Sequence, residues 1–244
     1  MPQPGACASR YAAAMADQDP GLALQDPSYR EGVVDLLGVL AYGELTAFER
    51  LAEDAKLAPS TRDKAQLASM AAEELRHFQA LGERLAALEA DVDEAMAPFR
   101  PAVDRFHEKT TPADWLEGLV KAYVGDGLAN DFYREIAAFV DADTRELILS
   151  TIAESGHSSF VVDRVRSAIK ADHRVAGRLA LWGRRLMGEA LSQAQAVVAE
   201  RDSLSDLISG SLDRPGMDLA AIGRMFTRLT DNHTKRMAAL GLSA

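Results

Sequence analysis

Residues 70–85 read MAAEELRHFQALGERL, a run in which an apolar stripe of helical period is interrupted by Glu74 and, three residues later, by His77. A second stretch, TIAESGHSSFV, repeats this arrangement at Glu154 and His157. A separation of three residues places two side chains on one face of a helix, about one turn apart. Apolar residues at intervals of three and four mark that face as buried, so each Glu-x-x-His pair is predicted to point into the protein.

Each Glu-x-x-His pair is preceded by a carboxylate that interrupts another apolar stripe. Glu44 precedes Glu74 by 30 residues, and Asp126 precedes Glu154 by 28. Each interval is long enough for the second half of one helix, a short turn and the first half of the next helix. At a rise of about 1.5 Å per residue, both members of such a hairpin lie at the same depth. The chain therefore reads as two hairpins related by a pseudo-twofold axis.

These positions have the residue types that a metal site requires. Burying one unpaired carboxylate costs several kcal/mol, and four converging carboxylates would also repel one another. A pair of divalent ions removes this cost, and carboxylate and imidazole ligands suit iron or manganese better than copper. The predicted metal ligands, which are also the predicted catalytic residues, are Glu44, Glu74, His77, Asp126, Glu154 and His157.

Proline placement indicates where long helices begin and end. None of the nine prolines lies between Pro112 and Pro215, and proline disfavours a helix interior because it lacks the N–H donor. Capping patterns at four positions mark helix starts: Ser28, Ser60, Thr111 and Asp143. The predicted helices cover about 29–56, 60–90, 112–140, 144–170, 173–202 and 217–240, with a long connection at 95–111.

These elements predict an all-α fold. It consists of a four-helix bundle with a long crossover between its second and third helices, followed by two extra C-terminal helices. We expect a flexible N-terminal leader at residues 1–27, the di-metal bundle at 28–171 and a helical extension at 172–244. The extension is expected to pack on the bundle and to form a single domain with it.

Composition excludes several classes of protein. The 244 residues include one cysteine, Cys7, which excludes a disulfide framework and a thiolate zinc site. The formal charge of -10 argues against a surface that coats nucleic acid. No apolar run approaches the roughly 18 residues that a membrane-spanning helix needs, and the N-terminus lacks the features of a signal peptide. We therefore expect a cytoplasmic protein without a membrane partner.

One carboxylate helix and one Glu-x-x-His helix, used twice, resemble the ferritin-like di-iron carboxylate superfamily, over residues 29–170. The resemblance implies one iron ion on each half of the ligand set, with Glu74 and Glu154 as bridges. Within the superfamily, chain length, the Tyr-Gly-Glu-Leu start and the C-terminal helices are most similar to actinobacterial MiaE-like proteins, which resemble the tRNA 2-methylthio-isopentenyladenosine hydroxylase. Asp126 stands where a glutamate is usual and reaches one methylene less far.

This resemblance implies an oxygen-dependent monooxygenase. Two iron ions would activate dioxygen as the co-substrate for hydroxylation of a C–H bond, with tRNA isopentenyl-adenosine as candidate substrate and an external electron donor as partner. Arginines of a basic stretch are candidate tRNA contacts: Arg164, Arg166, Arg174, Arg178, Arg184 and Arg185. For these arginines, pairing with acidic neighbours or with a second subunit, as in a homodimer, is the favoured alternative, because the stretch has few aromatic residues on which bases could stack.

Two other functions remain open at this point. One is a ferroxidase of the same fold that handles iron or peroxide, although cage-forming ferritins are shorter chains with one bundle. The other is a non-enzymatic interaction module with a vestigial site, which predicts no bound metal.

Further residues near the predicted metal level are open to more than one interpretation. Core packing is favoured over a redox role for three tyrosines: Tyr42, Tyr123 and Tyr133. Close helix packing and a cavity beside the metals are equal alternatives for four glycines: Gly43, Gly125, Gly127 and Gly156. The histidines without a ligand-spaced partner are expected on the surface or in loops: His107, His173 and His233.

Overall fold

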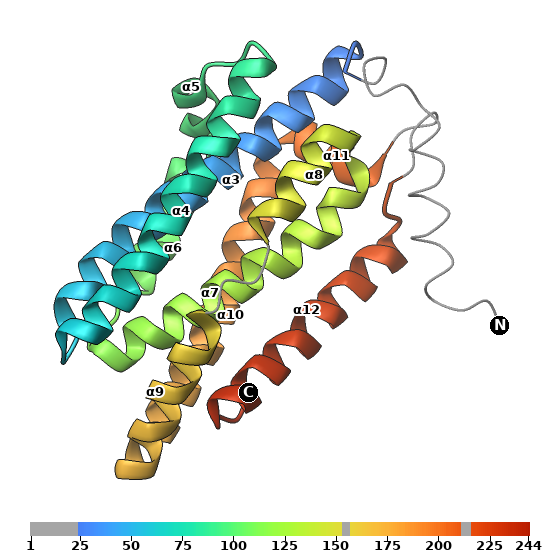
Figure 1. The fold of residues 1–244 in the computed structure, drawn as a ribbon. Helices are drawn as coiled ribbons and strands as arrows, with labels where there is room; N and C mark the ends of the chain where they lie inside the picture. Colours follow the sequence, from blue (N-terminus) through green and yellow to red (C-terminus); the bar gives the residue numbers. More distant parts are fainter. Residues whose placement is uncertain (1–23, 153–156, 211–215) are drawn as a thin grey trace.

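The computed structural model describes residues 24–152, 157–210 and 216–244, and within these ranges every regular element is a helix. The elements, labelled as in Figure 1, are α3 (Pro27–Asp54), η1 (Ala55–Leu57), α4 (Thr61–Ala87), α5 (Val92–Met96), η2 (Ala97–Phe99), α6 (Arg100–Lys109), α7 (Trp115–Ile136), η3 (Ala137–Phe139), α8 (Ala142–Thr151), α9 (His157–Ala171), α10 (Arg174–Glu200), α11 (Asp202–Ser209) and α12 (Leu219–Leu240). The predicted all-α fold is confirmed. None of these helices combines the length and the apolar character that a membrane crossing requires.

The helices form a bundle around the predicted site. α3 and α4 lie side by side along their length (Figure 1). α7 contacts α3, while α8 and α9 each contact both α4 and α7, which closes a ring of helices around a common interior. This arrangement buries one apolar stripe from each helix, as the spacing of three and four residues predicts.

Side-chain caps stabilise the starts of several helices. Of the four capping residues predicted from the sequence, one is correct. Ser60 caps α4 as predicted, with its hydroxyl accepting a hydrogen bond from the backbone N–H of Asp63 at 3.2 Å. The other three predictions were wrong by two or three residues, since the caps are Asp26 instead of Ser28, Asp114 instead of Thr111 and Asp141 instead of Asp143. A carboxylate is favoured there because it also interacts with the positive end of the helix dipole.

Three predicted helix extents need correction. The helix expected at 144–170 consists of two helices, α8 and α9, and residues 153–156 lie outside the described ranges. The connection at 95–111 is itself largely helical. Pro98 and Pro101 are compatible with this because each is the second residue of its element, η2 or α6, within the first turn, where no N–H donor is needed. Within its described residues, the C-terminal extension contains three helices, α10, α11 and α12, because α10 ends where Arg201 adopts an extended backbone conformation.

Two apolar clusters form the core on either side of the bundle interior. One includes Leu119 of α7 and Leu186 of α10, and the other includes Leu37 of α3 and Leu85 of α4, all of them fully buried. α10 packs on α6 and α7, α11 packs on α3, and α12 packs on α7. The C-terminal helices therefore cover the side of the bundle formed by α3, α6 and α7, whereas the domain boundaries stay a prediction.

Candidate metal centre

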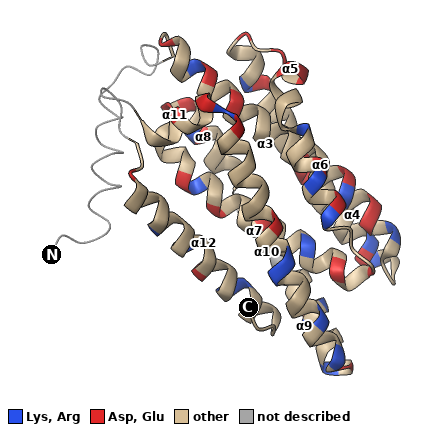
Figure 2. Ribbon diagram, turned by 180° about the vertical axis from the view of Figure 1, so that it is seen from behind, with Lys and Arg blue, Asp and Glu red and all other residues tan. Residues whose placement is uncertain are grey.

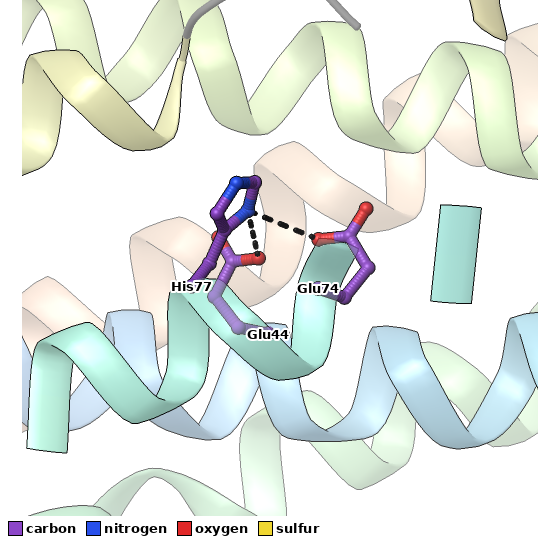
Figure 3. Close-up of side chains that lie close together, drawn as sticks. All are labelled: Glu44, Glu74 and His77. Atoms are coloured by element: carbon purple, nitrogen blue, oxygen red, sulfur yellow. Dashed lines mark hydrogen bonds and ion pairs between the residues drawn. The ribbon is translucent and has the colours of Figure 1, made fainter. Parts of the chain in front are cut away.

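Three of the six predicted ligands meet between α3 and α4. Glu44 projects from α3, and Glu74 and His77 project from one face of α4 (Figure 3). The His77 Nδ1 atom lies 3.4 Å from Glu44 Oε2 and 3.7 Å from Glu74 Oε2. One ligand atom from each residue lies within 4.8 Å of the other two, so all three can reach a single ion.

Asp126 of α7 lies at the same site but outside this group of three. It lines the same cavity as Glu44 and Glu74, and its Oδ1 accepts a hydrogen bond from Asn130 Nδ2 at 2.9 Å. Burial within the bundle and the nearby charge of Glu74 raise the pKa of Asp126 to about 6. The carboxylate nevertheless remains accessible to solvent, because it also lines a second, polar pocket.

The remaining two predicted ligands stay predictions. Glu154 lies outside the described residues, and α9 begins at His157 without a description of that side chain. The second half of the ligand set is therefore known here through Asp126 alone.

The electrostatics of the three-residue cluster fit a divalent ion. Burial, and next the hydrogen bond with Glu44, raise the pKa of Glu74 to about 8. Hydrogen bonds with Glu44 and Glu74 raise the pKa of His77 to about 10, so a positive charge is strongly favoured between the two carboxylates. A divalent ion supplies that charge, and two carboxylates with one imidazole are ligands that iron and manganese accept.

The three tyrosines have different positions. Burial, followed by the carboxylates of Glu44, Glu74 and Asp126, raises the pKa of Tyr133 well above its usual range. The Tyr42 hydroxyl instead donates a hydrogen bond to Asp104 at 2.7 Å, on an exposed part of the protein. Tyr123 lines the polar pocket that also contains Glu74 and Asp126, and burial raises its pKa as well. Tyr123 and Tyr133 are therefore the two tyrosines that lie near the carboxylates.

The carboxylates lie between two cavities of opposite character. On one side is a predominantly apolar cavity of about 320 Å³, lined mainly by residues of α3, α6, α7, α10 and α11. On the other side is a polar pocket of about 410 Å³, which also reaches His77 and Arg236. Glu74 and Asp126 line both cavities. The apolar cavity has a volume within the range of small-molecule sites.

The glycines near the site have two different roles. A Cβ atom at Gly125 would have no heavy atom within 4 Å, and Gly125 lines the apolar cavity. A Cβ atom at Gly127 would lie 2.4 Å from Arg236 Cδ, so this glycine permits close approach of α12. The cavity interpretation therefore applies to Gly125, and the close-packing interpretation applies to Gly127. Gly156 lies outside the described ranges.

Gly125 provides a prediction because its helix has room for a methyl group. Glycine in a helix interior costs about 1 kcal/mol relative to alanine, so Gly125→Ala should raise the free energy of unfolding by about 0.5–1 kcal/mol. The matched control is Gly38→Ala, because a Cβ there would lie 2.2 Å from the backbone oxygen of Ala95. Gly38→Ala should therefore lower the free energy of unfolding by about 1–3 kcal/mol. Urea unfolding of both variants checks the opposite signs, and equal effects would contradict this view of the cavity.

Sequence reasoning missed a group of polar residues at one end of the apolar cavity. His107 was expected on the surface or in a loop, but it lies on α6, lines the cavity and bonds through Nε2 to Thr46 Oγ1 at 3.1 Å. Lys121 of α7 is buried, and its Nζ donates a hydrogen bond to the Thr110 carbonyl at 2.8 Å. The sequence contained one indication of this position. Lys121 lies four residues before Gly125, so both residues are on the same face of the helix, and Gly125 was already a candidate for lining a cavity.

The other two histidines differ from each other. His233 is buried, so its predicted surface position was wrong, whereas His173 is exposed as expected. His107 is half-buried against the cavity, and neither His107 nor His233 has a ligand-spaced partner that would have indicated its position from the sequence.

Burial gives Lys121 a measurable pH signature. Burial lowers the pKa of Lys121 from 10.5 to about 8, so the unfolded chain binds more protons than the folded protein between about pH 8 and 10.5. Stability should therefore rise with pH across this window, by on the order of 2–3 kcal/mol from this group. Urea unfolding of wild type and Lys121→Met at pH 7, 8.5 and 10 isolates the effect, because other groups titrate in both. Equal slopes in the two proteins would contradict it.

Several arginines of the basic stretch have partners within the chain. Basic residues gather on α9 and the adjoining part of α10 (Figure 2). Arg164 Nε lies 2.8 Å from Asp63 Oδ1, and Arg178 pairs with Asp114 at 2.6 Å and with Glu117. For Arg164 and Arg178 the structure matches the alternative of acidic neighbours. The tRNA contacts, the electron donor and the homodimer remain predictions.

A helical bundle that brings a carboxylate from one helix to a Glu-x-x-His pair on the next defines a ferritin-like protein. The family model for the ferritin-like domain of actinomycetes matches residues 27–211, and the chain belongs to this family. Among solved structures, it is similar to Protein 19 with aldehyde deformylating oxidase activity from Synechococcus, with a TM-score of 0.67 and 20% identity over 89% of this chain and 93% of that chain. No curated protein matches the sequence. The narrower resemblance to MiaE-like proteins stays a prediction.

Proposed function

We propose that this protein is a di-iron, dioxygen-dependent oxidoreductase, and specifically a hydroxylase of an apolar substrate. The observation that carries this proposal is the apolar cavity of about 320 Å³ whose lining includes Glu44, Glu74 and Asp126. An iron pair, when bound, supplies the activation of dioxygen. The cavity would hold an apolar carbon beside that pair and exclude bulk water from it.

The chain's own residues divide this work among them. Glu44, Glu74 and His77 would hold one ion, and Asp126 would serve the second together with Glu154 and His157. Tyr133 keeps its proton at any physiological pH, because burial and next the charge of Glu44 raise its pKa. A protonated hydroxyl beside a ligating carboxylate can donate a hydrogen bond to it, and the loss of an outer partner of this kind typically costs 10–100-fold in metal affinity or activity.

The cavity favours this proposal over the two alternatives. A ferroxidase or iron-handling protein has no need of an apolar cavity beyond its ligands, whereas a hydroxylase needs one to hold its substrate. A vestigial interaction module would have no reason to keep the largely buried Glu74 carboxyl, whose pKa is raised to about 8, because its burial costs stability without a metal. That the substrate is the tRNA nucleoside implied by the resemblance is a separate proposal. In that case the apolar cavity would bind the isopentenyl group of the nucleoside.

Anaerobic loading with ferrous iron tests the proposal directly. We expect about two iron ions per chain, followed by oxygen consumption and a change in optical absorption on exposure to air. Absence of bound iron, or zinc that iron does not displace, would overturn the proposal in favour of the vestigial module. A native mass near that of a 24-subunit cage would instead favour the ferroxidase.

A further inference from the structure

The apolar cavity has one polar end, which the metal chemistry does not use. Arg50 of α3, His107 of α6 and Lys121 of α7 line this end, and we call them the head-group site. They come from three helices that are distant in sequence, and none of them is a predicted metal ligand.

The head-group site contains polar atoms that have no partner. Within the described residues, Arg50 Nε and His107 Nδ1 are buried without a hydrogen-bond partner. The bond from Lys121 Nζ to the Thr110 carbonyl uses one of the three donors of the ammonium group. Buried polar atoms are nearly always paired in folded proteins, and an unpaired one costs about 1–3 kcal/mol. The site therefore has capacity for a polar group of a ligand.

His107 offers a ligand one unpaired ring nitrogen. Its Nε2 atom forms a hydrogen bond with the Thr46 hydroxyl at 3.1 Å, which leaves Nδ1 free. Burial lowers the pKa of His107 to about 3, which keeps the ring neutral. A neutral imidazole has one donor and one acceptor nitrogen, and a hydroxyl group can pair with either. The site thus combines this nitrogen with the donors of Arg50 and Lys121.

The two cations already have carboxylate partners. Arg50 Nη1 lies 2.7 Å from Glu53 Oε2, and the charge of Asp54 acts on Lys121. No surplus positive charge therefore remains for an anionic ligand to neutralise. A neutral hydroxyl, which donates one hydrogen bond and accepts others, matches this set.

The position of the carboxylates along the cavity defines which part of a ligand they face. On α3, Glu44 lies six residues from Arg50 and eight from Leu36, which is about 9 Å and 12 Å along the helix. Leu36, Val197 and Leu204 line the opposite, apolar end. A ligand anchored at the head-group site would therefore present an internal carbon of its chain to Glu44.

We propose that Arg50, His107 and Lys121 bind the hydroxyl head of an uncharged, chain-like apolar substrate, so that a carbon within its chain faces Glu44, Glu74 and Asp126. The assignment of that substrate to a hydroxylation rests on the proposed function, whereas the binding itself does not require metal.

Equilibrium binding to the full-length, metal-free protein tests this proposal without reference to activity. Calorimetric titrations with 1-decanol, decanoate and decyltrimethylammonium compare three head groups on the same chain. We expect 1-decanol to bind at least tenfold more tightly than either ion. Equal affinity for all three, tighter binding of decanoate, or absence of 1-decanol binding would overturn the proposal.

Two variants and one control locate the head group. His107→Phe and Lys121→Met should each weaken 1-decanol binding about tenfold, because each removes a hydrogen-bonding partner. Lys64→Met alters an exposed lysine of α4 outside the cavity and should bind as the wild type does. Unchanged binding in both site variants would overturn the assignment. If a variant fails to fold, the ligand series on the unmodified protein still decides. Because no iron is present, a failure of iron loading leaves this result intact.

Discussion

Glu74→Ala should abolish iron binding by the Glu44–Glu74–His77 cluster. An oxygen of Glu74 lies within 4.8 Å of ligand atoms from both other residues, and the resemblance assigns Glu74 as a bridge between the two ions. Its removal therefore weakens both halves of the site. We expect iron content to fall from about two ions per chain to fewer than one in metal analysis after anaerobic loading.

The same variant should lose the stabilisation that metal provides. At a free iron concentration 100 times the Kd, binding stabilises a folded protein by about 2.7 kcal/mol. For a chain of this length, that raises Tm by roughly 5–10 °C, and the rise should be absent in Glu74→Ala. Without metal, the variant should be at least as stable as wild type, because burial already disfavours the charged form of Glu74.

Glu73→Ala is the matched control for this experiment. It makes the same chemical change one position away, where Glu73 lies 3.7 Å from Arg76 and is not among the three residues whose ligand atoms meet. Iron content and the metal-dependent rise in Tm should match those of wild type. Full iron occupancy in Glu74→Ala would refute the ligand assignment, whatever the control shows.

Arg201→Met should destabilise the protein by about 3 kcal/mol. Asp35 of α3 is 4% exposed and accepts hydrogen bonds from Arg201 Nε at 2.9 Å and Nη2 at 2.6 Å, with a further bond from Ser203. Removal of the arginine leaves a buried carboxylate without its counter-charge, which typically costs 3–5 kcal/mol. The lower figure applies because Arg201 is itself partly exposed. Thermal unfolding should show a fall in Tm of roughly 6–12 °C.

The double variant Asp35→Leu with Arg201→Met separates this mechanism from simple loss of packing. Replacement of both members of a buried ion pair with apolar residues is often neutral, so most of the lost stability should return. Arg76→Met alters an exposed arginine and should change stability by less than 0.5 kcal/mol. A loss of less than 0.5 kcal/mol in Arg201→Met would contradict the prediction.

Arg201→Met should also weaken 1-decanol binding, because α11 contributes Leu204 and Ile208 to the apolar cavity.

The positions of Glu44, Glu74 and His77 show what could be predicted from sequence spacing. Each lies in an apolar stripe, and helical periodicity is a local property that a single stretch of sequence contains. The interval of 30 residues between Glu44 and Glu74 then sets their common depth, because the rise per residue is constant. The prediction that these three side chains converge needed no knowledge of any other helix.

The helix boundaries were less predictable, for a reason visible at α8 and α9. Periodicity continues across residues 144–170 and favours one helix, yet the structure has two. Asp26, Asp114 and Asp141 likewise cap their helices in place of nearby residues with similar capping ability. Competing local signals of similar energy are decided by packing, which the local sequence does not contain.

The sequence by itself therefore determined the all-α class, the antiparallel hairpin of α3 and α4, and the carboxylate–histidine cluster that this hairpin carries. Only the tertiary structure decided that Arg50, His107 and Lys121 meet at one end of an apolar cavity, and that Gly125 borders open space while Gly127 contacts Arg236. The physical reason is the range of the interactions. Helix formation and the faces of a helix depend on residues within one or two turns, whereas a cavity depends on how side chains from separate helices fill the space between them.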